Sequence, residues 1–283
     1  MLKDYYWLAK PGIIYGNAIA AIAGYFLAAG TNVNFVTFLV MLVGLCLVIG
    51  SACVVNNVMD RDMDKKMKRT QWRGTANGKI SVRAALIYAV ALGVAGFGLL
   101  ALTTWYAVIA AVVGVVFYVA LYSPAKRQTV YAAVIGSVAG AVPPVVGYTA
   151  ASNSFDTGAL LLFIIMAIWQ MPHFYAIAIF RMKDYAAASV PVLPRKIGMK
   201  NTKIQIAVYV AAYLIAALLL TVFGYTGYVY AVIMGVLSLV WLQKALRGFK
   251  AADDTKWARQ LFHFSLYVLM TFCVTISLDM VLP

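Results

Sequence analysis

Glutamate is absent from this chain of 283 residues, and all nine of its acidic residues are aspartate. Charged residues make up only 11% of the sequence, less than half of the share that is usual in soluble domains. The three cysteines stand apart in apolar stretches without a CxxC pair, which favours neither disulfides nor a thiolate metal site. Hydrophobic residues reach 64%. This composition excludes an ordinary soluble globule and requires lipid as the solvent for most of the chain.

Long apolar runs predict nine membrane-spanning helices, since each run has the roughly 17–25 residues that a helix needs to cross a bilayer. The expected spans are 13–30, 35–55, 82–102, 105–122, 131–150, 158–179, 203–223, 226–246 and 260–281. We expect the first span to be retained, because it is long for the apolar part of a cleaved signal peptide. The sequence therefore predicts an all-α, polytopic membrane protein with a single domain over residues 1–283.

The distribution of positive charge supports this layout. The 23 lysines and arginines give the chain a net charge of +14. If the spans alternate in direction, every one of these cations falls on the same side of the membrane. The positive-inside rule then places the N-terminus in the cytoplasm and the C-terminus outside, which requires an odd number of spans. The basic excess thus indicates membrane topology, and we expect no nucleic-acid partner.

An acidic cluster follows the second span. Asn56, Asp60 and Asp64 recur at intervals of four residues, so one amide and two carboxylates share a helix face if the span continues as a helix. Oxygen ligands at this spacing suit a hard divalent cation such as Mg²⁺, which is commonly shared with substrate phosphates. The alternative is that the carboxylates only pair with neighbouring cations in a solvated loop. The membrane edge and the scarcity of acids elsewhere favour the metal site.

Four basic residues on the same side of the membrane are suited to bind a diphosphate beside this metal: Arg69, Arg73, Lys126 and Arg127. Ionisable residues are nearly missing from the middle of the predicted spans. Ion-coupled transporters usually carry such a residue at mid-depth, so the sequence argues against a transporter.

The run NNVMDRDMD, residues 56–64, is similar to the first aspartate-rich motif of the UbiA-type intramembrane prenyltransferases. Two further stretches resemble one branch of this family, the haem O synthases, which farnesylate protohaem IX. Residues 169–185 read WQMPHFYAIAIFRMKDY, and residues 190–194 read VPVLP. The resemblance extends from Lys10 to about Arg259.

The resemblance implies a fold and a reaction. The fold is nine helices around a central cavity that opens to the cytoplasmic side of a bacterial inner membrane. In the reaction, farnesyl diphosphate joins the 2-vinyl group of haem B, water adds, and diphosphate leaves to give haem O. Mg²⁺ is the implied cofactor, whereas haem B is a substrate. The implied catalytic residues are Asp60, Asp64, Tyr122, Lys126 and Arg127.

The second aspartate pair of many UbiA-type enzymes is missing here. After the sixth span the chain has one acid, Asp184, preceded by Arg181 and Lys183. Either Asp184 serves as a metal ligand, or Arg181 and Lys183 bind the diphosphate directly. By the resemblance Tyr175, together with Tyr122, shields carbocations with its ring face. His173 is expected to hydrogen-bond to a helix backbone or to a diphosphate, with axial ligation of haem iron as the alternative.

Three other functions stay open at this point. The acceptor of the prenyl group could be a quinone precursor, or the chain could be a transporter. A third possibility is a non-catalytic assembly factor for a terminal oxidase, which would not need Asp60 or Asp64. A haem-modifying enzyme or the assembly machinery of a terminal oxidase is the protein partner that the resemblance implies, and membrane lipid surrounds the chain.

Overall fold

The computed structural model describes residues 2–279, which form helices joined by short loops and contain no strand. Nine segments in this range are long and apolar enough to cross a membrane, which confirms the predicted number. They are α2 (Pro11–Ala29), α3 (Phe35–Asp64), α4 (Val82–Leu100), the continuous α5 (Trp105–Val115), η1 (Val116–Tyr122) and α6 (Ser123–Ala125), then α7 (Ala132–Ser152), α8 (Thr157–Phe180), α11 (Met199–Val222), α12 (Tyr228–Arg247) with η2 (Gly248–Lys250), and α13 (Asp254–Leu278). The predicted end of the ninth span, residue 281, lies outside the described residues.

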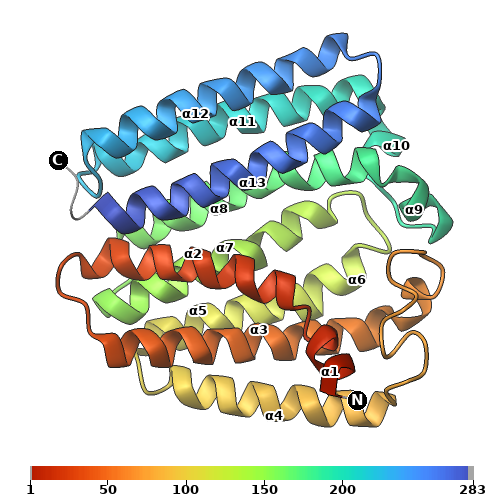
Figure 1. Cartoon of the computed structure of the whole chain (residues 1–283), viewed down its shortest axis with the longest axis horizontal. Coiled ribbons are helices and arrows are strands. Elements are labelled where there is room, and N and C mark those ends of the chain that lie inside the picture. Colours follow the sequence, from red (N-terminus) through yellow and green to blue (C-terminus); the bar gives the residue numbers. More distant parts are fainter. Residues whose placement is uncertain (1, 280–283) are drawn as a thin grey trace.

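The long helices lie side by side along the longest axis of the molecule (Figure 1). Three short helices, α1 (Leu2–Leu8), α9 (Met182–Ala187) and α10 (Leu193–Ile197), lie at one end with the loop 65–81, and we call this the basic end. The last turn of α13 lies at the opposite end. The connections there, 30–34, 101–104, 153–156 and 223–227, contain no lysine or arginine. The helices therefore alternate in the way that the charge distribution requires.

Helix α3 is longer than the span predicted for it. It begins at the Asn34 side chain, which accepts hydrogen bonds from the backbone N–H groups of Val36 and Thr37 at 3.1 and 3.0 Å. It then runs for 30 residues, past the predicted end at residue 55, to Asp64. This extension makes the whole acidic cluster helical.

Helices α2 and α7 approach each other so closely that only glycine fits at two positions. A Cβ atom on Gly147 would lie 1.9 Å from the carbonyl oxygen of Ala21, and one on Gly24 would lie 2.0 Å from that of Pro144. Small residues permit such contact between helix backbones in lipid, where dispersion forces replace the hydrophobic effect. This pair also packs on neighbours from both halves of the chain, with α3 and α5 on one side and α8 and α13 on the other.

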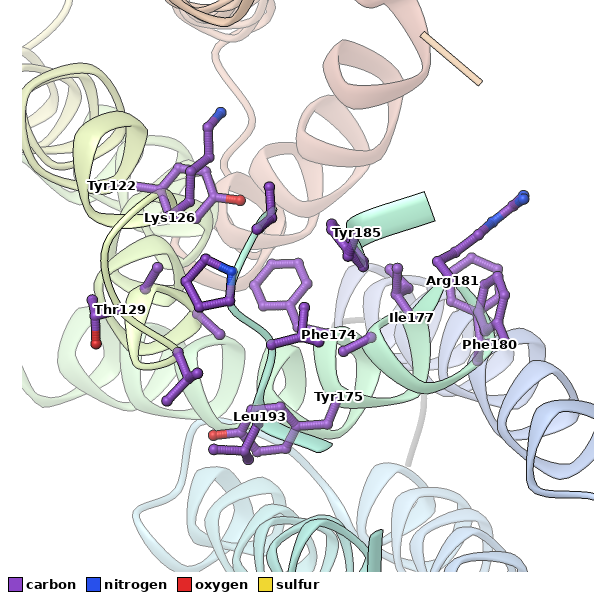
Figure 2. Close-up of a pocket in the computed structure, with 18 of the residues that line it drawn as sticks. Tyr122, Lys126, Thr129, Phe174, Tyr175, Ile177, Phe180, Arg181, Tyr185 and Leu193 are labelled. Carbon is purple, nitrogen blue, oxygen red and sulfur yellow. The ribbon is translucent and has the colours of Figure 1, made fainter. Parts of the chain in front are cut away.

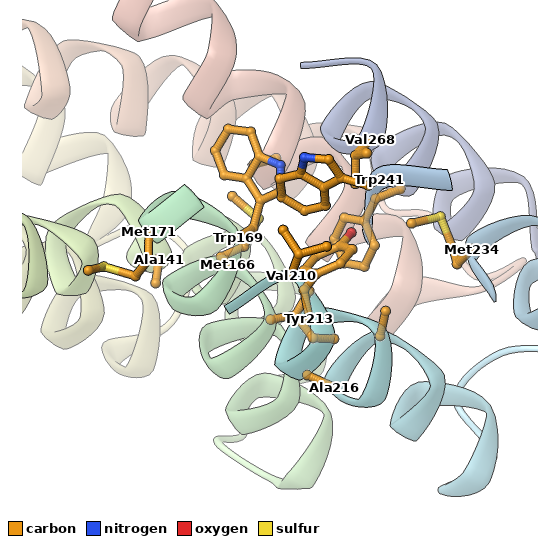
Figure 3. Close-up of a cluster of buried hydrophobic side chains, with 14 of the residues drawn as sticks. Ala141, Met166, Trp169, Met171, Val210, Tyr213, Ala216, Met234, Trp241 and Val268 are labelled. Atoms are coloured by element: carbon orange, nitrogen blue, oxygen red, sulfur yellow. The ribbon is translucent and has the colours of Figure 1, made fainter. Parts of the chain in front are cut away.

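A cluster of buried aromatic and aliphatic side chains joins α8, α11, α12 and α13 (Figure 3). The rings of Tyr213 and Trp241 meet edge to face, with centroids 5.4 Å apart. Trp169 donates a hydrogen bond from its indole N–H to the carbonyl oxygen of Ser265 at 2.9 Å. The hydrogen bond joins the middle of α8 to the middle of α13, and both helices border the cavity described below.

We expect Gly147→Ala to lower the thermal stability of the protein in detergent. The added methyl group collides with the backbone of α2, and overpacking of this kind costs about 1–3 kcal/mol. Gly98→Ala is the matched control, because a Cβ atom at Gly98 meets nothing within 4 Å. An equal melting temperature for both variants would contradict the close crossing of α2 and α7.

Candidate active site

The end of α3 carries three buried polar side chains in a single row. Asn56, Asp60 and Asp64 have exposed fractions of 1%, 3% and 1%. Asp62 lies on the other face of the helix, and its side chain is 69% exposed. The structure thus confirms the helical row that the sequence spacing predicts. The solvated loop of the alternative is wrong, because both carboxylates are buried on a helix, whereas the pairing with cations that it expected is present.

Three of the predicted cations come together at these carboxylates. Arg73 of the loop 65–81 donates a hydrogen bond to Asp64, with 2.8 Å between Nη1 and Oδ2. Lys126 donates a short hydrogen bond to Oδ2 of Asp60, and Nη2 of Arg127 lies 3.5 Å from Oδ1 of the same carboxylate. Burial lowers the pKa of Lys126, and the neighbouring Asp60 carboxylate opposes this shift. Ion pairs therefore join three chain segments: α3, the loop 65–81 and the residues that follow α6.

Lys10 is a further member of this cluster, which sequence reasoning did not include. Its ammonium group donates a hydrogen bond to Oδ1 of Asn56 at 2.5 Å, and Asn56 in turn donates one to the Ser123 hydroxyl at 2.7 Å. Burial lowers the pKa of Lys10 to about 8. Its backbone has φ 56° directly before Pro11, a conformation that costs free energy for a residue other than glycine. In the sequence, only its place before a proline at the membrane edge pointed to this partly buried lysine.

Helix α5 changes to a π-helix at η1 before it reaches the site. Both the backbone N–H and the hydroxyl of Ser123 donate to the carbonyl oxygen of Tyr118, the latter at 2.9 Å. Wide turns of this kind are frequent at functional sites. The residues after the wide turn face the carboxylates, because Lys126 contacts Asp60 and lies 5.3 Å from the ring centroid of Tyr122.

The donor groups on α3 fit a hard divalent cation. Oδ1 of Asp60 is buried without a hydrogen bond, and such an atom favours an additional positive partner. Asn56 and Asp64 add an amide oxygen, which here accepts from Lys10, and a carboxylate, which here pairs with Arg73, one turn to either side. Three oxygen-bearing side chains of one helix would thus hold Mg²⁺.

Asp184 is not grouped with Asp60 and Asp64 in the structure, and its role as a metal ligand stays a prediction. Within residues 2–279, no group of three His, Cys, Asp or Glu side chains could hold a metal ion. The Asp184 carboxylate instead lies 3.5 Å from Nη1 of Arg181, three residues earlier. Lys183 is exposed to solvent. Asp184 belongs to the short helix α9 beyond the end of α8.

A cavity of about 480 Å³ lies beside this cluster at the basic end. Figure 2 shows Lys126 and Tyr122 at one side of the cavity, Arg181 and Phe180 at the other, and Phe174 between them. Five predicted site residues line it: Arg69, Tyr122, Lys126, Tyr175 and Arg181. The lining residues that were not predicted include Tyr185, Arg259 and His263. The last two belong to α13, and their sequence distance from the motifs gave no signal.

His173 does not line the cavity, although the sequence places it nearby. Its Nδ1 atom lies 2.8 Å from the Ser265 hydroxyl, which itself donates to the carbonyl oxygen of Phe262 at 2.6 Å. The imidazole therefore donates from Nδ1. Its ring is also stacked on Trp169 and tilted against Phe262, with centroid distances of 4.9 and 4.8 Å. The partner of Nδ1 is thus a serine hydroxyl rather than a helix backbone, and a contact with a diphosphate stays a prediction.

A family model and individual proteins of known name are similar to this chain over most or all of its length. Residues 17–267 match the model of the UbiA prenyltransferase family. A protein of Sodalis glossinidius (strain morsitans) named protoheme IX farnesyltransferase is 49% identical over 286 residues, which cover 100% of this chain and 96% of that protein. A protein of the same name from Serratia proteamaculans (strain 568) is 49% identical over 285 residues, 99% and 95% of the two chains.

Solved structures share the fold at much lower identity. A structure described as that of a digeranylgeranylglyceryl phosphate synthase has a TM-score of 0.84 at 18% identity and covers 99% of this chain and 98% of its own. A UbiA homologue from Archaeoglobus fulgidus bound to GPP and Mg²⁺ has a TM-score of 0.67 at 14% identity, with coverage of 97% and 99%. The nine apolar helices and the sequence matches make this chain an integral membrane protein. It belongs to the UbiA prenyltransferase family.

Proposed function

We propose that this chain transfers a farnesyl group from farnesyl diphosphate to the 2-vinyl group of protohaem IX. The observation that carries the proposal is the 49% identity, over full length, to proteins whose name states both this donor and this acceptor. The buried carboxylate row beside a largely apolar cavity supplies the matching chemistry. Haem B is consumed as a substrate, and the product is haem O.

The diphosphate of the donor binds at the α3 side of the cavity in this proposal. Lys126 and Arg69 line the cavity there, and their cations bind the outer diphosphate oxygens. Asn56, Asp60 and Asp64 would hold Mg²⁺, which when bound would supply Lewis-acid neutralisation of the charge on the leaving diphosphate. The homologue bound to GPP and Mg²⁺ supports this cofactor and this class of donor.

The bond changes balance without a covalent enzyme intermediate. The bond between C1 of the farnesyl group and oxygen breaks, and diphosphate leaves with the electron pair. The terminal vinyl carbon of haem B bonds to C1, after which a water oxygen adds to the inner vinyl carbon and releases a proton. The aromatic rings of Tyr122, Phe174 and Tyr175 line the cavity, where their faces stabilise the carbocations and limit the entry of water.

The basic end faces the cytoplasm of a bacterial inner membrane in this proposal, with the N-terminus inside and the C-terminus outside. The absence of lysine and arginine from the four connections at the opposite end supports this orientation. Haem O then leaves toward a haem-modifying enzyme or the assembly machinery of a terminal oxidase.

We expect Asp60→Asn and Asp64→Asn to reduce haem O formation by about a hundredfold or more, because each removes a charged metal ligand. Membranes would be incubated with haem B, farnesyl diphosphate and Mg²⁺, and the haems extracted and separated. Asp62→Asn is the control, since this exposed carboxylate lies on the other face of α3. Undiminished haem O from either buried variant would refute the metal site.

Lys126→Gln should raise the KM for farnesyl diphosphate by about tenfold or more, because a charge-assisted contact to the diphosphate is lost. Lys66→Gln serves as the control, because Lys66 is exposed in the neighbouring loop 65–81. Steady-state kinetics at saturating haem B would measure the effect. The role of Lys126 in donor binding is wrong if its variant keeps the KM of the unaltered protein.

The orientation is tested by labelling single cysteines in intact cells with a membrane-impermeant maleimide. Cys53 and Cys273 are buried, whereas Cys46 is partly exposed and is therefore replaced by serine. In this Cys46→Ser background, Thr31→Cys at the end opposite the basic end should react from outside. Lys68→Cys in the loop 65–81 should react only after permeabilisation. Both positions are exposed to solvent. The reverse pattern would show that the basic end faces outward.

A further inference from the structure

The cavity has a second cationic side, far along its wall from Lys126. Arg181 at the end of α8 and Arg259 near the start of α13 both line the cavity. Figure 2 shows Arg181 and Phe180 across the cavity from Lys126 and Tyr122, with Phe174 between the two sides. The basic residues around the acidic row of α3 therefore form only one of the two cationic sides of the cavity.

The two guanidinium groups are held at one aromatic ring. The Cζ atoms of Arg181 and Arg259 lie 5.3 and 5.8 Å from the ring centroid of Phe180. Phe180 is fixed in turn by an edge-to-face contact with Phe262, at a centroid distance of 5.4 Å. Cation–π contact of both side chains with one ring places two positive charges close together although helices far apart in sequence carry them.

These charges are incompletely neutralised within the described residues. Asp184 lies 3.5 Å from Arg181, in a partly exposed pair that orients the guanidinium more than it cancels its charge. Arg259 forms no ion pair with an acidic side chain of residues 2–279. His263 lines the same side one turn further along α13. The pair is thus available for anionic groups of a ligand, and guanidinium groups suit carboxylates through paired hydrogen bonds.

We infer that Arg181 and Arg259 bind the carboxylates of the acceptor, which for haem B are its two propionates. The inference rests on the proposed function and deepens it by giving the orientation of haem. The vinyl and propionate groups stand on opposite edges of protohaem. Propionates at Arg181 and Arg259 therefore turn the vinyl edge toward Lys126 and the carboxylate row, where the farnesyl diphosphate binds. The apolar wall around Phe174 contacts the porphyrin face between these two edges.

Binding titrations with two forms of the acceptor test this orientation. Absorption of the haem would be followed as haem B or its dimethyl ester is added to the purified protein in detergent. The unaltered protein should bind haem B about tenfold or more tighter than the ester, because esterification removes both carboxylates. Arg259→Gln and Arg181→Gln should each weaken the binding of haem B about tenfold and leave the binding of the ester nearly unchanged.

Arg247→Gln is the matched control, since this exposed arginine of α12 does not line the cavity. An unchanged KM for farnesyl diphosphate in both variants would support the assignment and show that they are folded. The inference is overturned if the variants keep the preference for haem B over its ester. It is equally overturned if they raise the KM for farnesyl diphosphate instead, because the pair would then belong to the donor site. Haem O production by the unaltered protein is scored separately, so failure of the proposed function is distinguishable.

Discussion

A carboxylate buried at the end of a membrane helix needs a positive partner, and Asp60 and Asp64 obtain theirs from different parts of the chain. Arg73 comes from the loop 65–81, whereas Lys126 and Arg127 follow α6. Removal of one partner from a buried pair leaves an uncompensated charge, which typically costs about 3–5 kcal/mol. The loop and the end of α6 are therefore fixed to α3 by electrostatics. The position of Lys126, and with it one wall of the cavity, depends on these pairs.

Backbone and hydroxyl contacts strengthen the same attachment. Thr75 donates a hydrogen bond to the carbonyl oxygen of Asn57 at 3.1 Å, and Thr70 donates one to that of Asp64 at 3.2 Å. Asn57 itself donates to the carbonyl oxygen of Leu8 at the end of α1. A loop of basic and polar residues thus becomes an ordered cover over one side of the site. The lysines of this loop keep its outer surface positive, while Arg73 pairs with the buried carboxylate of Asp64.

The spans and the acidic row could be predicted from the sequence because each depends on local patterns. Hydropathy identifies a membrane helix without knowledge of its neighbours, and a spacing of four residues identifies one helix face. Lys10, Arg259 and His263 could not be found in this way, because their place at the site follows from how α2 and α13 pack in three dimensions. The partner of Asp184 was missed for a related reason. Its position depends on where α8 ends and α9 begins, and residues near such a junction have no fixed periodicity.

The wide turn at η1 changes the direction in which the later side chains point around the helix axis. In an α-helix each residue advances about 100° around the axis, so one residue more or less turns every later side chain by that angle. The bond pattern of a π-helix accommodates an extra residue within a helix that otherwise continues. The residues from Trp105 to Val115 can therefore present one face to α7, while Ser123 and Lys126 turn independently toward α3. Val116–Tyr122 thus separates the requirements of helix packing from those of the site, and a change on the packed face of α5 need not rotate the lysine away from its carboxylate.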